Sequence, residues 1–234
     1  MKGCGREICG LPCCTVILGD CDEYLWQLTD GCVDIVITDP PYGMSFVSGA
    51  RKEKYKAIVG DDRLPVESLV EIIKKPRLAT YAFARWDNLW DHESLPKPKS
   101  VLTWVKTGTG MGDLNHEHGR ASEIALFYPG SEHKFKVRPS DIMDSRRTGN
   151  VVHPTQKPVE LIREMLKWYD FETVLDPYVG GGTTALAALE LKKHFLAFEI
   201  DPTHYAVAKG RIESLQGKPI TTQGERQEGI NFGG

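Results

Sequence analysis

The sequence predicts an α/β protein built on a doubly wound, mostly parallel β-sheet. Short apolar runs with the composition of strands alternate with amphipathic, helix-like segments along the chain, and this alternation is typical of βαβ units. The chain has 234 residues, of which 41% are hydrophobic and 26% are charged. This composition is that of a globular protein with a sizeable core, and it excludes a disordered or collagen-like chain.

The first predicted βαβ unit spans residues 15–39. Its strands are TVILGD (15–20) and the apolar run VDIVITD (33–39), and DEYLWQL between them is predicted to form a short helix. Leu25 and Leu28 fall on one face of that helix, whose first turn is acidic. Strands joined through a helix are expected to run parallel. The prolines of DPPYG then end the second strand, because proline cannot donate a ladder hydrogen bond.

The middle of the chain alternates strands with long loops. A polar, basic loop of residues 44–62 precedes a helix that opens at Pro65. The segment of about 129–150 shows no periodicity, and we interpret it as an irregular, partly basic insertion. Between the helix and the insertion, strands are predicted for ATYAFARW (79–86), SVLTWVK (100–106) and EIALFY (123–128).

The last third of the chain has the clearest pattern. Pro158 begins a predicted helix, and residues 173–201 follow as a strand, a Gly-rich turn, a helix and a second strand. A last helix covers 204–215. We therefore predict a domain of residues 15–215, preceded by a Cys-rich segment (1–14) and followed by a polar, flexible tail (216–234).

Charge and hydropathy bear on the cellular location of the protein, and they say little about its binding partners. The formal net charge is −3, so overall charge does not indicate a nucleic-acid partner. Basic runs at 51–56, 133–138 and 145–147 are, taken alone, typical of solvated surface. No apolar run approaches the length of a membrane span or of a secretory signal. We therefore expect a soluble, cytoplasmic protein with no membrane partner.

The cysteines are confined to the first 32 residues. They form no CxxC pair, and no histidine lies near them in sequence to complete a zinc site. Disulfides are unusual in cytoplasmic chains. We therefore expect reduced thiols, and no metal site, at Cys4, Cys9, Cys13, Cys14, Cys21 and Cys32.

Residues 173–201 have the pattern of a Rossmann-like, nucleoside-binding unit. The first strand ends at Asp176, glycines at 180–182 form a turn, and Thr183 opens a helix. Glycines allow the backbone to approach a ligand closely, and a helix N-terminus presents unpaired N–H groups to an anion. Glu199 ends the next strand, where an acid can accept hydrogen bonds from a ribose diol. The turn YVGGG is not GxGxxG, which argues against a dinucleotide.

The motif Asp39-Pro40-Pro41-Tyr42 follows a strand that is predicted to be buried. The motif is either a proline turn by which the chain leaves the sheet, or a binding motif. Two prolines remove two N–H donors and leave carbonyls as acceptors. The Asp39 carboxylate adds an acceptor, and the Tyr42 ring adds a flat stacking surface. This combination suits a planar group that carries an –NH₂, provided that the unit of residues 173–201 lies nearby.

Together these motifs resemble those of the DNA amino-methyltransferases. DPPY is similar to their catalytic motif, and DPYVGGGTT (176–184) to their S-adenosylmethionine motif, with Tyr178 where the family usually has Phe. HPTQKPVELI (153–162) and the opening GDC (19–21) also resemble family segments. Because DPPY precedes the glycine motif, the order is that of the permuted beta group. The resemblance covers about residues 15–212 and implies a permuted class I methyltransferase fold with a small target-recognition insertion.

The resemblance implies S-adenosylmethionine as the cofactor and an exocyclic amine as the methyl acceptor. Asp39 and the Pro40 carbonyl would each accept one amine N–H, which frees the nitrogen lone pair for in-line attack. Tyr42 would stack on a base rotated out of the duplex. The implied catalytic residues are Asp39, Pro40, Pro41 and Tyr42. The implied cofactor-binding residues are Asp20, Cys21, Thr155, Lys157, Asp176, Pro177, Tyr178, Gly180, Gly182, Thr183, Thr184 and Glu199.

Individual cofactor contacts follow from the same resemblance. The methionine carboxylate is expected near the helix start at Thr183, with Lys157 adjacent. Glu199 is expected to hold the ribose hydroxyls. Asp20 and Cys21 are expected at the adenine edge, although a buried thiol accounts for Cys21 equally well.

The resemblance implies double-stranded DNA as the partner and the N6 amine of adenine as the acceptor. In the family, Asp in the first motif position is more common for adenine but also occurs with cytosine, so N4 of cytosine is the alternative. An RNA base or a protein glutamine amide is a further alternative, although glutamine-directed relatives usually carry Asn in place of Asp39. The loop 44–60 and the insertion 129–150 are expected to contact DNA. The sequence leaves open a homodimer and a companion restriction nuclease.

Overall fold

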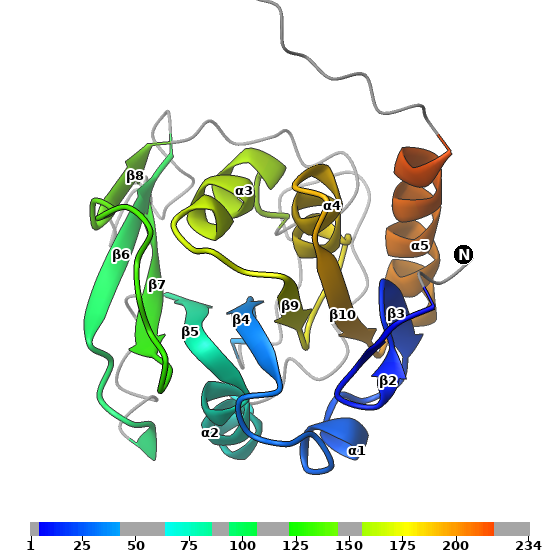
Figure 1. Cartoon of the computed structure of the whole chain (residues 1–234), viewed down its shortest axis with the longest axis horizontal. Helices are drawn as coiled ribbons and strands as arrows, with labels where there is room; N and C mark the ends of the chain where they lie inside the picture. The colour runs from blue at the N-terminus through cyan, green and yellow to red at the C-terminus, as the bar shows by residue number, and fades with distance from the viewer. Residues whose placement is uncertain (1–4, 43–63, 86–93, 107–121, 145–155, 218–234) are drawn as a thin grey trace, which may run out of the picture.

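The computed structural model of the chain describes residues 5–42, 64–85, 94–106, 122–144 and 156–217. Within these ranges one eight-stranded sheet runs through the molecule, with helices on both faces (Figure 1). The strand order is β3-β10-β9-β4-β5-β7-β6-β8. The predicted doubly wound α/β fold is therefore confirmed.

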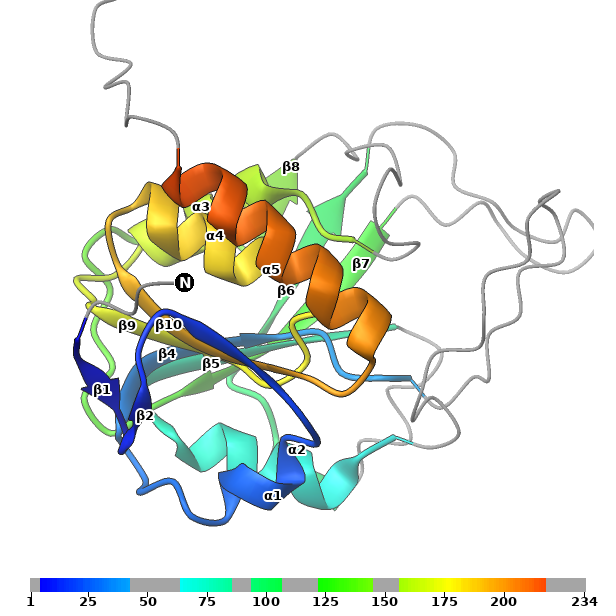
Figure 2. The ribbon, with the colours of Figure 1, turned by 90° about the vertical axis from the view of Figure 1, so that its right-hand side faces the viewer.

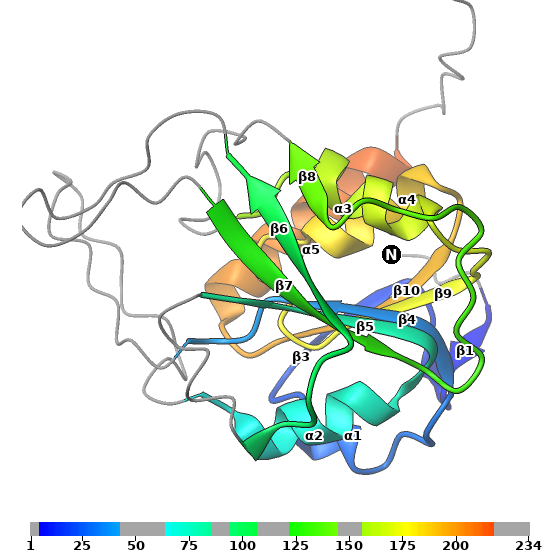
Figure 3. The same cartoon turned by 90° about the vertical axis from the view of Figure 1, so that its left-hand side faces the viewer.

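Five neighbouring strands form the parallel half of the sheet. In spatial order they are β3 (Thr15–Leu18), β10 (His194–Glu199), β9 (Thr173–Asp176), β4 (Val33–Thr38) and β5 (Pro76–Ala84). The outer strands are β7 (Ser122–Pro129), antiparallel to β5, then β6 (Ser100–Val105), antiparallel to β7, and β8 (Ile142–Asp144), parallel to β6 (Figure 3). The sheet is mostly parallel, as the sequence predicts.

The helices divide between the two faces of the sheet (Figure 2). One face carries α1 (Asp22–Leu25) and α2 (Val66–Lys74). The other carries α3 (Val159–Lys167), α4 (Thr183–Glu190) and α5 (Pro202–Gln216). None of the helices in these described segments is long and apolar enough to cross a membrane.

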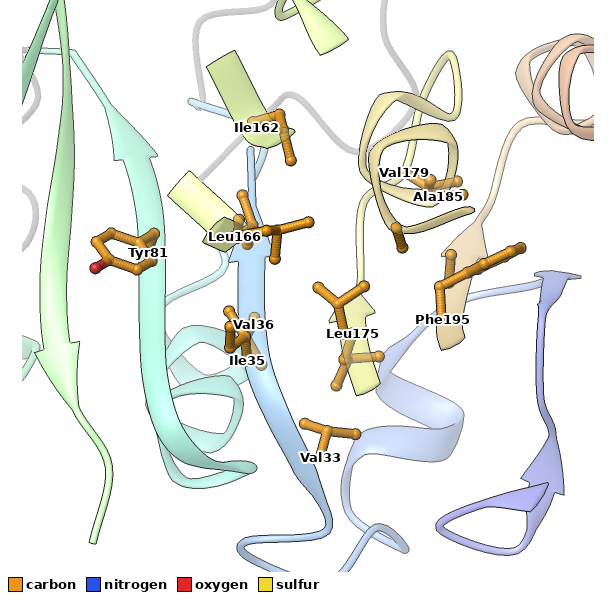
Figure 4. Packing of buried hydrophobic residues seen from close by; sticks show 14 of the residues in the cluster. Val33, Ile35, Val36, Tyr81, Ile162, Leu166, Leu175, Val179, Ala185 and Phe195 are labelled. Carbon is orange, nitrogen blue, oxygen red and sulfur yellow. The ribbon is translucent and has the colours of Figure 1, made fainter. Parts of the chain in front are cut away.

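The core lies on both faces of β4. All six residues of this strand are buried, as expected for a strand that is covered by helices on each side. Figure 4 shows Ile35 and Val36 of β4 among the core side chains, with Leu175 of β9 and Leu166 of α3. These side chains are at most 1% exposed. The strand that leads to the DPPY motif is therefore held on all sides.

A short hairpin precedes the sheet, formed by β1 (Glu7–Ile8) and β2 (Leu11–Pro12). Its two turn residues, Cys9 and Gly10, both have positive φ, as a two-residue hairpin turn of type I′ requires. Cys9 forms a disulfide with Cys32, and their Cα atoms are 5.6 Å apart. The expectation of reduced thiols is therefore wrong for this pair, whereas Cys13, Cys14 and Cys21 are thiols.

The segment predicted as an irregular insertion contains more structure than its sequence indicates. Residues 142–144 form β8 at the edge of the sheet. His133 and Phe135 pack against the rings of Phe127 and Tyr169. Within the basic run 133–138, His133 and Phe135 therefore pack against other rings of the fold, although the charge of the run suggests solvated surface.

Candidate active site

The carboxyl ends of β4 and β9 lie side by side in the middle of the sheet. Val36 pairs with Leu175, and the strands end two residues and one residue later, at Thr38 and Asp176. From β4 the chain passes through α2 to β5, whereas from β9 it passes through α4, on the opposite face, to β10 (Figure 2). Such a divergence is a topological switch point, where α/β sheets bind their ligands.

A pocket of about 470 Å³, its open mouth included, lies at this switch point. Asp39 lines it from the DPPY segment. The glycine motif lines it with Asp176, Gly180, Thr183 and Thr184. The two motifs are far apart in sequence, and the pocket brings them together as the sequence predicts.

Both carboxylate oxygens of Asp39 are engaged. The Tyr42 hydroxyl donates to Oδ1 and the Lys157 ammonium donates to Oδ2, each at 2.5 Å. Pro40 is buried and Pro41 is half-buried where the chain leaves β4. Burial and the Asp39 charge raise the pKa of Tyr42, so its hydroxyl keeps its proton and donates. Asp39 and Tyr42 therefore form one contact pair.

Lys157 belongs to a network of alternating charges that sequence reasoning missed. Its ammonium lies 3.2 Å from Glu123 Oε2 on β7, and Glu123 also pairs with Lys106. Burial disfavours the charge of Lys157, but Asp39 and Glu123 raise its pKa. Burial likewise opposes ionisation of Glu123, yet Lys157 and Lys106 lower its pKa to about 2. Lys157 and Glu123 are therefore both charged at neutral pH, and each compensates the charge of the other.

The glycine turn is braced by Glu199 at the end of β10. The Gly180 N–H donates to Oε2 at 2.8 Å and the Asp201 N–H donates to Oε1 at 2.9 Å. Burial raises the pKa of this carboxyl. Each carboxylate oxygen can accept a second hydrogen bond, so these contacts are compatible with the ribose contact that the resemblance implies.

Gly182 has a different role from the one that the sequence indicates. It precedes α4 with a φ of 83°, and a Cβ there would lie 3.2 Å from both Cα and Cβ of Ala208 in α5. A side chain at Gly182 would therefore press on α5 and not on a ligand. Glycine is needed here for backbone conformation and helix packing, which corrects the interpretation that ligand approach requires it.

Asp176 is a buried carboxyl that faces the pocket. Burial raises its pKa from 3.8 to about 7, although hydrogen bonds from Thr184 and from the Tyr178 N–H lower it. The nearby charges of Asp39 and Glu199 raise the pKa further. A cation bound beside Asp176 would relieve this penalty.

Asp20 and Cys21 follow β3 and lie near the same end of the sheet, because the Gly19 N–H donates to the Glu199 carbonyl at 2.9 Å. Asp20 is exposed and Cys21 is buried. The Cys21 thiol contacts the Tyr178 side chain, and burial raises the thiol pKa to about 12. Cys21 is therefore a protonated, buried thiol behind a residue that lines the pocket.

Of the remaining predicted residues, the structure describes some and not others. Thr183 Oγ1 donates to the Lys157 carbonyl at 3.3 Å and so ties α4 to the segment before α3. Pro177 is buried between Asp176 and the turn. Thr155 and the basic loop 44–62 lie outside the described residues.

Part of the insertion that is predicted to contact DNA lies at the end of the sheet opposite the pocket. The Gly130 N–H donates to the Leu78 carbonyl near the start of β5, whereas Asp39 follows the carboxyl end of the parallel neighbour β4. Exposed Lys134 and Lys136 come four and six positions after Gly130. These two lysines therefore lie away from the pocket, and the contact of the insertion with DNA stays a prediction.

Comparison with protein families identifies the chain. The N6/N4 methyltransferase model, described as DNA methylase, matches residues 33–210. The chain belongs to this DNA methylase family. The DNA methylase is 25% identical to YubD of Escherichia coli K12 over 220 residues, which are 86% of this chain and 90% of YubD. It is 34% identical to the type II methyltransferase M.HindIII of Haemophilus influenzae over 113 residues, 46% of this chain and 36% of that protein.

Solved structures share the fold of this DNA methylase. The M1.HpyAVI–SAM complex matches with a TM-score of 0.63 and 22% identity, covering 84% of this chain and 98% of that one. The cytosine-N4-specific PvuII DNA methyltransferase matches with a TM-score of 0.65 and 15% identity, covering 86% and 89%. At these identities the likeness shows the class I methyltransferase fold, and the substrate has to be argued from the site.

Proposed function

We propose that this DNA methylase transfers a methyl group from S-adenosylmethionine to the N6 amine of adenine in double-stranded DNA. The observation that carries the proposal is that Asp39, Asp176 and the glycine turn line the same pocket. A carboxylate suited to an amine and a turn suited to a nucleoside thus face one small space. When the amine and the methyl donor are held in one pocket, their reaction no longer depends on a chance encounter. This proximity lowers the activation barrier substantially.

The pocket chemistry suits S-adenosylmethionine. When bound, this cofactor supplies an electrophilic methyl group on a positively charged sulfur. Asp176 offers a buried carboxylate with acidic neighbours, which a cation would stabilise. The N–H groups at the start of α4, at Thr183 and Thr184, suit the cofactor's own carboxylate.

Asp39 and the Pro40 carbonyl are proposed to activate the amine. The amine lone pair is delocalised into the base, and acceptance of both N–H groups turns the nitrogen toward tetrahedral geometry. Asp39 Oδ1 is held by the Tyr42 hydroxyl and Oδ2 by Lys157. The entering amine therefore displaces the hydroxyl, while Lys157 keeps the carboxylate oriented. After transfer the nitrogen is cationic and acidic, and Asp39 accepts its proton.

The acceptor amine is unreachable inside a duplex, so the base must rotate out of the helix. Tyr42 is half-buried beside Asp39, and its ring is proposed to stack on that base. The match to DNA methylases favours DNA over the alternatives of an RNA base or a protein glutamine amide. Adenine is proposed because of Asp39, and N4 of cytosine could be activated by the same two acceptors.

The experiment that tests this function identifies the modified base. Protein is incubated with methyl-labelled S-adenosylmethionine and unmethylated double-stranded DNA, and the DNA is digested to nucleosides for mass spectrometry. Labelled N6-methyladenine is the expected product. Labelled N4-methylcytosine would overturn the choice of base, and absence of label from all nucleosides, with DNA of diverse sequence, would overturn the function.

A further inference from the structure

Two adjacent cysteines and a distant histidine converge at the amino end of β10. Cys13 Sγ lies 3.1 Å from His194 Nδ1 and 3.3 Å from Cys14 Sγ. Cys14 Sγ lies 3.5 Å from the same nitrogen, although the two residues are 180 positions apart in sequence. We propose that these three side chains form a binding site for a zinc ion.

The distances between the three atoms fit a common zinc ion. Zinc binds thiolate sulfur at roughly 2.3 Å and imidazole nitrogen at roughly 2.0–2.1 Å, usually in a tetrahedron, so that two ligand atoms lie roughly 3.4–3.8 Å apart. The observed separations of 3.1–3.5 Å are close to this range. Sulfur and imidazole ligands also favour zinc over calcium or magnesium, which prefer oxygen. A water can complete the tetrahedron.

The backbone holds the two sulfurs on the same side. Neighbouring side chains of an extended chain point to opposite faces, but Cys14 has a left-handed φ of 54°. The Cys13 N–H donates to the Arg6 carbonyl at 3.0 Å, and the Cys14 N–H donates to the Phe195 carbonyl at 2.7 Å. Cys13 and Cys14 are 1% and 7% exposed. The ligands are therefore positioned by buried structure before any ion arrives.

Arg6 determines how protons move when zinc binds. Its guanidinium has only donors and lies 3.1 Å from His194 Nε2. Nε2 therefore accepts, and Nδ1 carries the ring proton, which points to Cys13. Zinc at Nδ1 releases both thiol protons and moves the ring proton to Nε2, so Arg6 must turn to solvent. Arg6→Gln offers an oxygen that accepts from Nε2–H, and it should bind zinc more tightly.

The location indicates a structural zinc site. His194 begins β10 and Glu199 ends it at the active-site edge, and a strand of that length spans about 16 Å at roughly 3.3 Å per residue. Zinc would fasten the chain after the β1–β2 hairpin to the start of β10. The Cys9–Cys32 disulfide fastens the same hairpin to the chain before β4. Zinc would thus stabilise the N-terminal segment without taking part in methyl transfer.

The test loads the full chain with Co²⁺ under reducing conditions, since Co²⁺ bound to thiolates absorbs light in characteristic bands. Wild type should bind one equivalent, show thiolate-to-cobalt absorption and lose it when zinc is added. Cys13→Ser/Cys14→Ser should lack the absorption, and His194→Asn should weaken binding more than about tenfold. The matched control, Cys9→Ser/Cys32→Ser, removes two cysteines from the same region and should keep it.

Three results would overturn the proposal. Wild type could show no cobalt absorption and retain no zinc by elemental analysis. The absorption could persist in Cys13→Ser/Cys14→Ser, which would mean an adventitious ion only. The absorption could instead be lost in the Cys9→Ser/Cys32→Ser control. The wild-type spectrum and His194→Asn, which keeps both thiols, decide the matter even if the double variant does not fold.

Discussion

The ammonium of Lys157 lies 2.5 Å from Asp39 Oδ2, although the two residues are 118 positions apart in the chain. The family resemblance implies that Lys157 binds the cofactor and that Asp39 binds the acceptor amine. Their contact shows that an ion pair joins the segment before α3 to the segment that follows β4. Because Glu123 shares Lys157 with Asp39, the orientation of the proposed catalytic carboxylate depends on β7 as well as on β4.

Lys157→Met removes the ammonium that contacts Asp39 Oδ2. If Lys157 positions Asp39, the variant should lower kcat for methyl transfer about 100-fold, the cost of a small misplacement of a reacting group. Its Kd for S-adenosylmethionine, measured by calorimetry, should change less than about threefold. Lys157→Arg keeps the charge and should recover part of kcat. A large rise in Kd with kcat preserved would instead mean that Lys157 holds the cofactor.

Lys193→Met is the matched control for that experiment. Lys193 forms a comparable ion pair with Glu172 at 2.5 Å, but the pair is exposed and lies at the start of β10, away from the pocket. Exposed ion pairs contribute little. We expect kcat within about twofold of wild type for this variant, since the loss of a lysine in itself should not affect methyl transfer.

Two substitutions of Tyr42 distinguish the contribution of its ring to methyl transfer from that of its hydroxyl. Tyr42→Ala should lower kcat/KM for DNA by about 10- to 100-fold, because base–aromatic stacking contributes roughly 1–3 kcal/mol. Tyr42→Phe keeps the ring and removes only the hydroxyl that occupies Asp39 Oδ1, so it should remain within about fivefold of wild type. Steady-state kinetics on one DNA substrate gives both values. Equal losses in the two variants would show that the ring does not stack on the target base.

Asp176→Asn should stabilise the cofactor-free protein in a pH-dependent way. The pKa of Asp176 is raised from 3.8 to about 7, so below about pH 4 the carboxyl is protonated in both the folded and the unfolded chain. Between pH 4 and 7 only the unfolded chain loses the proton, and the free energy of unfolding falls with pH by at most about 4 kcal/mol. The variant should therefore unfold at higher urea concentration than wild type at pH 8, and at nearly the same concentration at pH 4.

The same substitution should weaken the binding of S-adenosylmethionine. Asn cannot offer the negative charge that is proposed to face the cationic sulfur. Wild-type binding should also release a proton near pH 7, which calorimetry in buffers of different ionisation enthalpy would detect. Stabilisation at pH 8 together with unchanged cofactor affinity would contradict the proposed role of Asp176.

Much of the fold and half of the site could be predicted because they depend on local rules. The strands that end at Thr38, directly before Asp39, and at Asp176 are parallel and adjacent, and the carboxyl ends of such strands meet at one edge. The helix starts at Pro65 and Pro158 were also predictable, to within one residue, from the fixed φ of proline. These features require only the periodicity of the sequence and the geometry of βαβ units.

The remainder depends on contacts between distant residues, for which the sequence carries no local signal. Glu123 lies on β7 and Lys106 directly follows its antiparallel neighbour β6, so the register of these strands sets the charge network. A charged residue beside an apolar run is usually taken as surface. His194 completes a cluster with Cys13 and Cys14 only because β10 pairs with β3. The Cys9–Cys32 disulfide likewise depends on where the hairpin packs.

Two glycines provide a matched test of the packing around the turn. Gly182→Ala should destabilise the protein by more than about 1–2 kcal/mol, because its positive φ strains any side chain and its Cβ would press on Ala208. Gly210→Ala lies in α5, where a Cβ meets nothing within 4 Å, and it should stabilise by about 0.5–1 kcal/mol. Urea unfolding of both variants checks this pair. A neutral Gly182→Ala would contradict the contact with α5.

The most direct test of the central claim is to separate cofactor binding from methyl transfer at Asp39. Asp39→Asn removes the carboxylate and keeps its shape, so the protein should bind S-adenosylmethionine with a Kd within about threefold of wild type. Its transfer of labelled methyl to DNA should fall at least about 1000-fold, within the range that proton-accepting groups contribute. Transfer near the wild-type rate, or loss of cofactor binding together with transfer, would contradict the claim that Asp39 activates an amine in the pocket that it shares with the glycine turn.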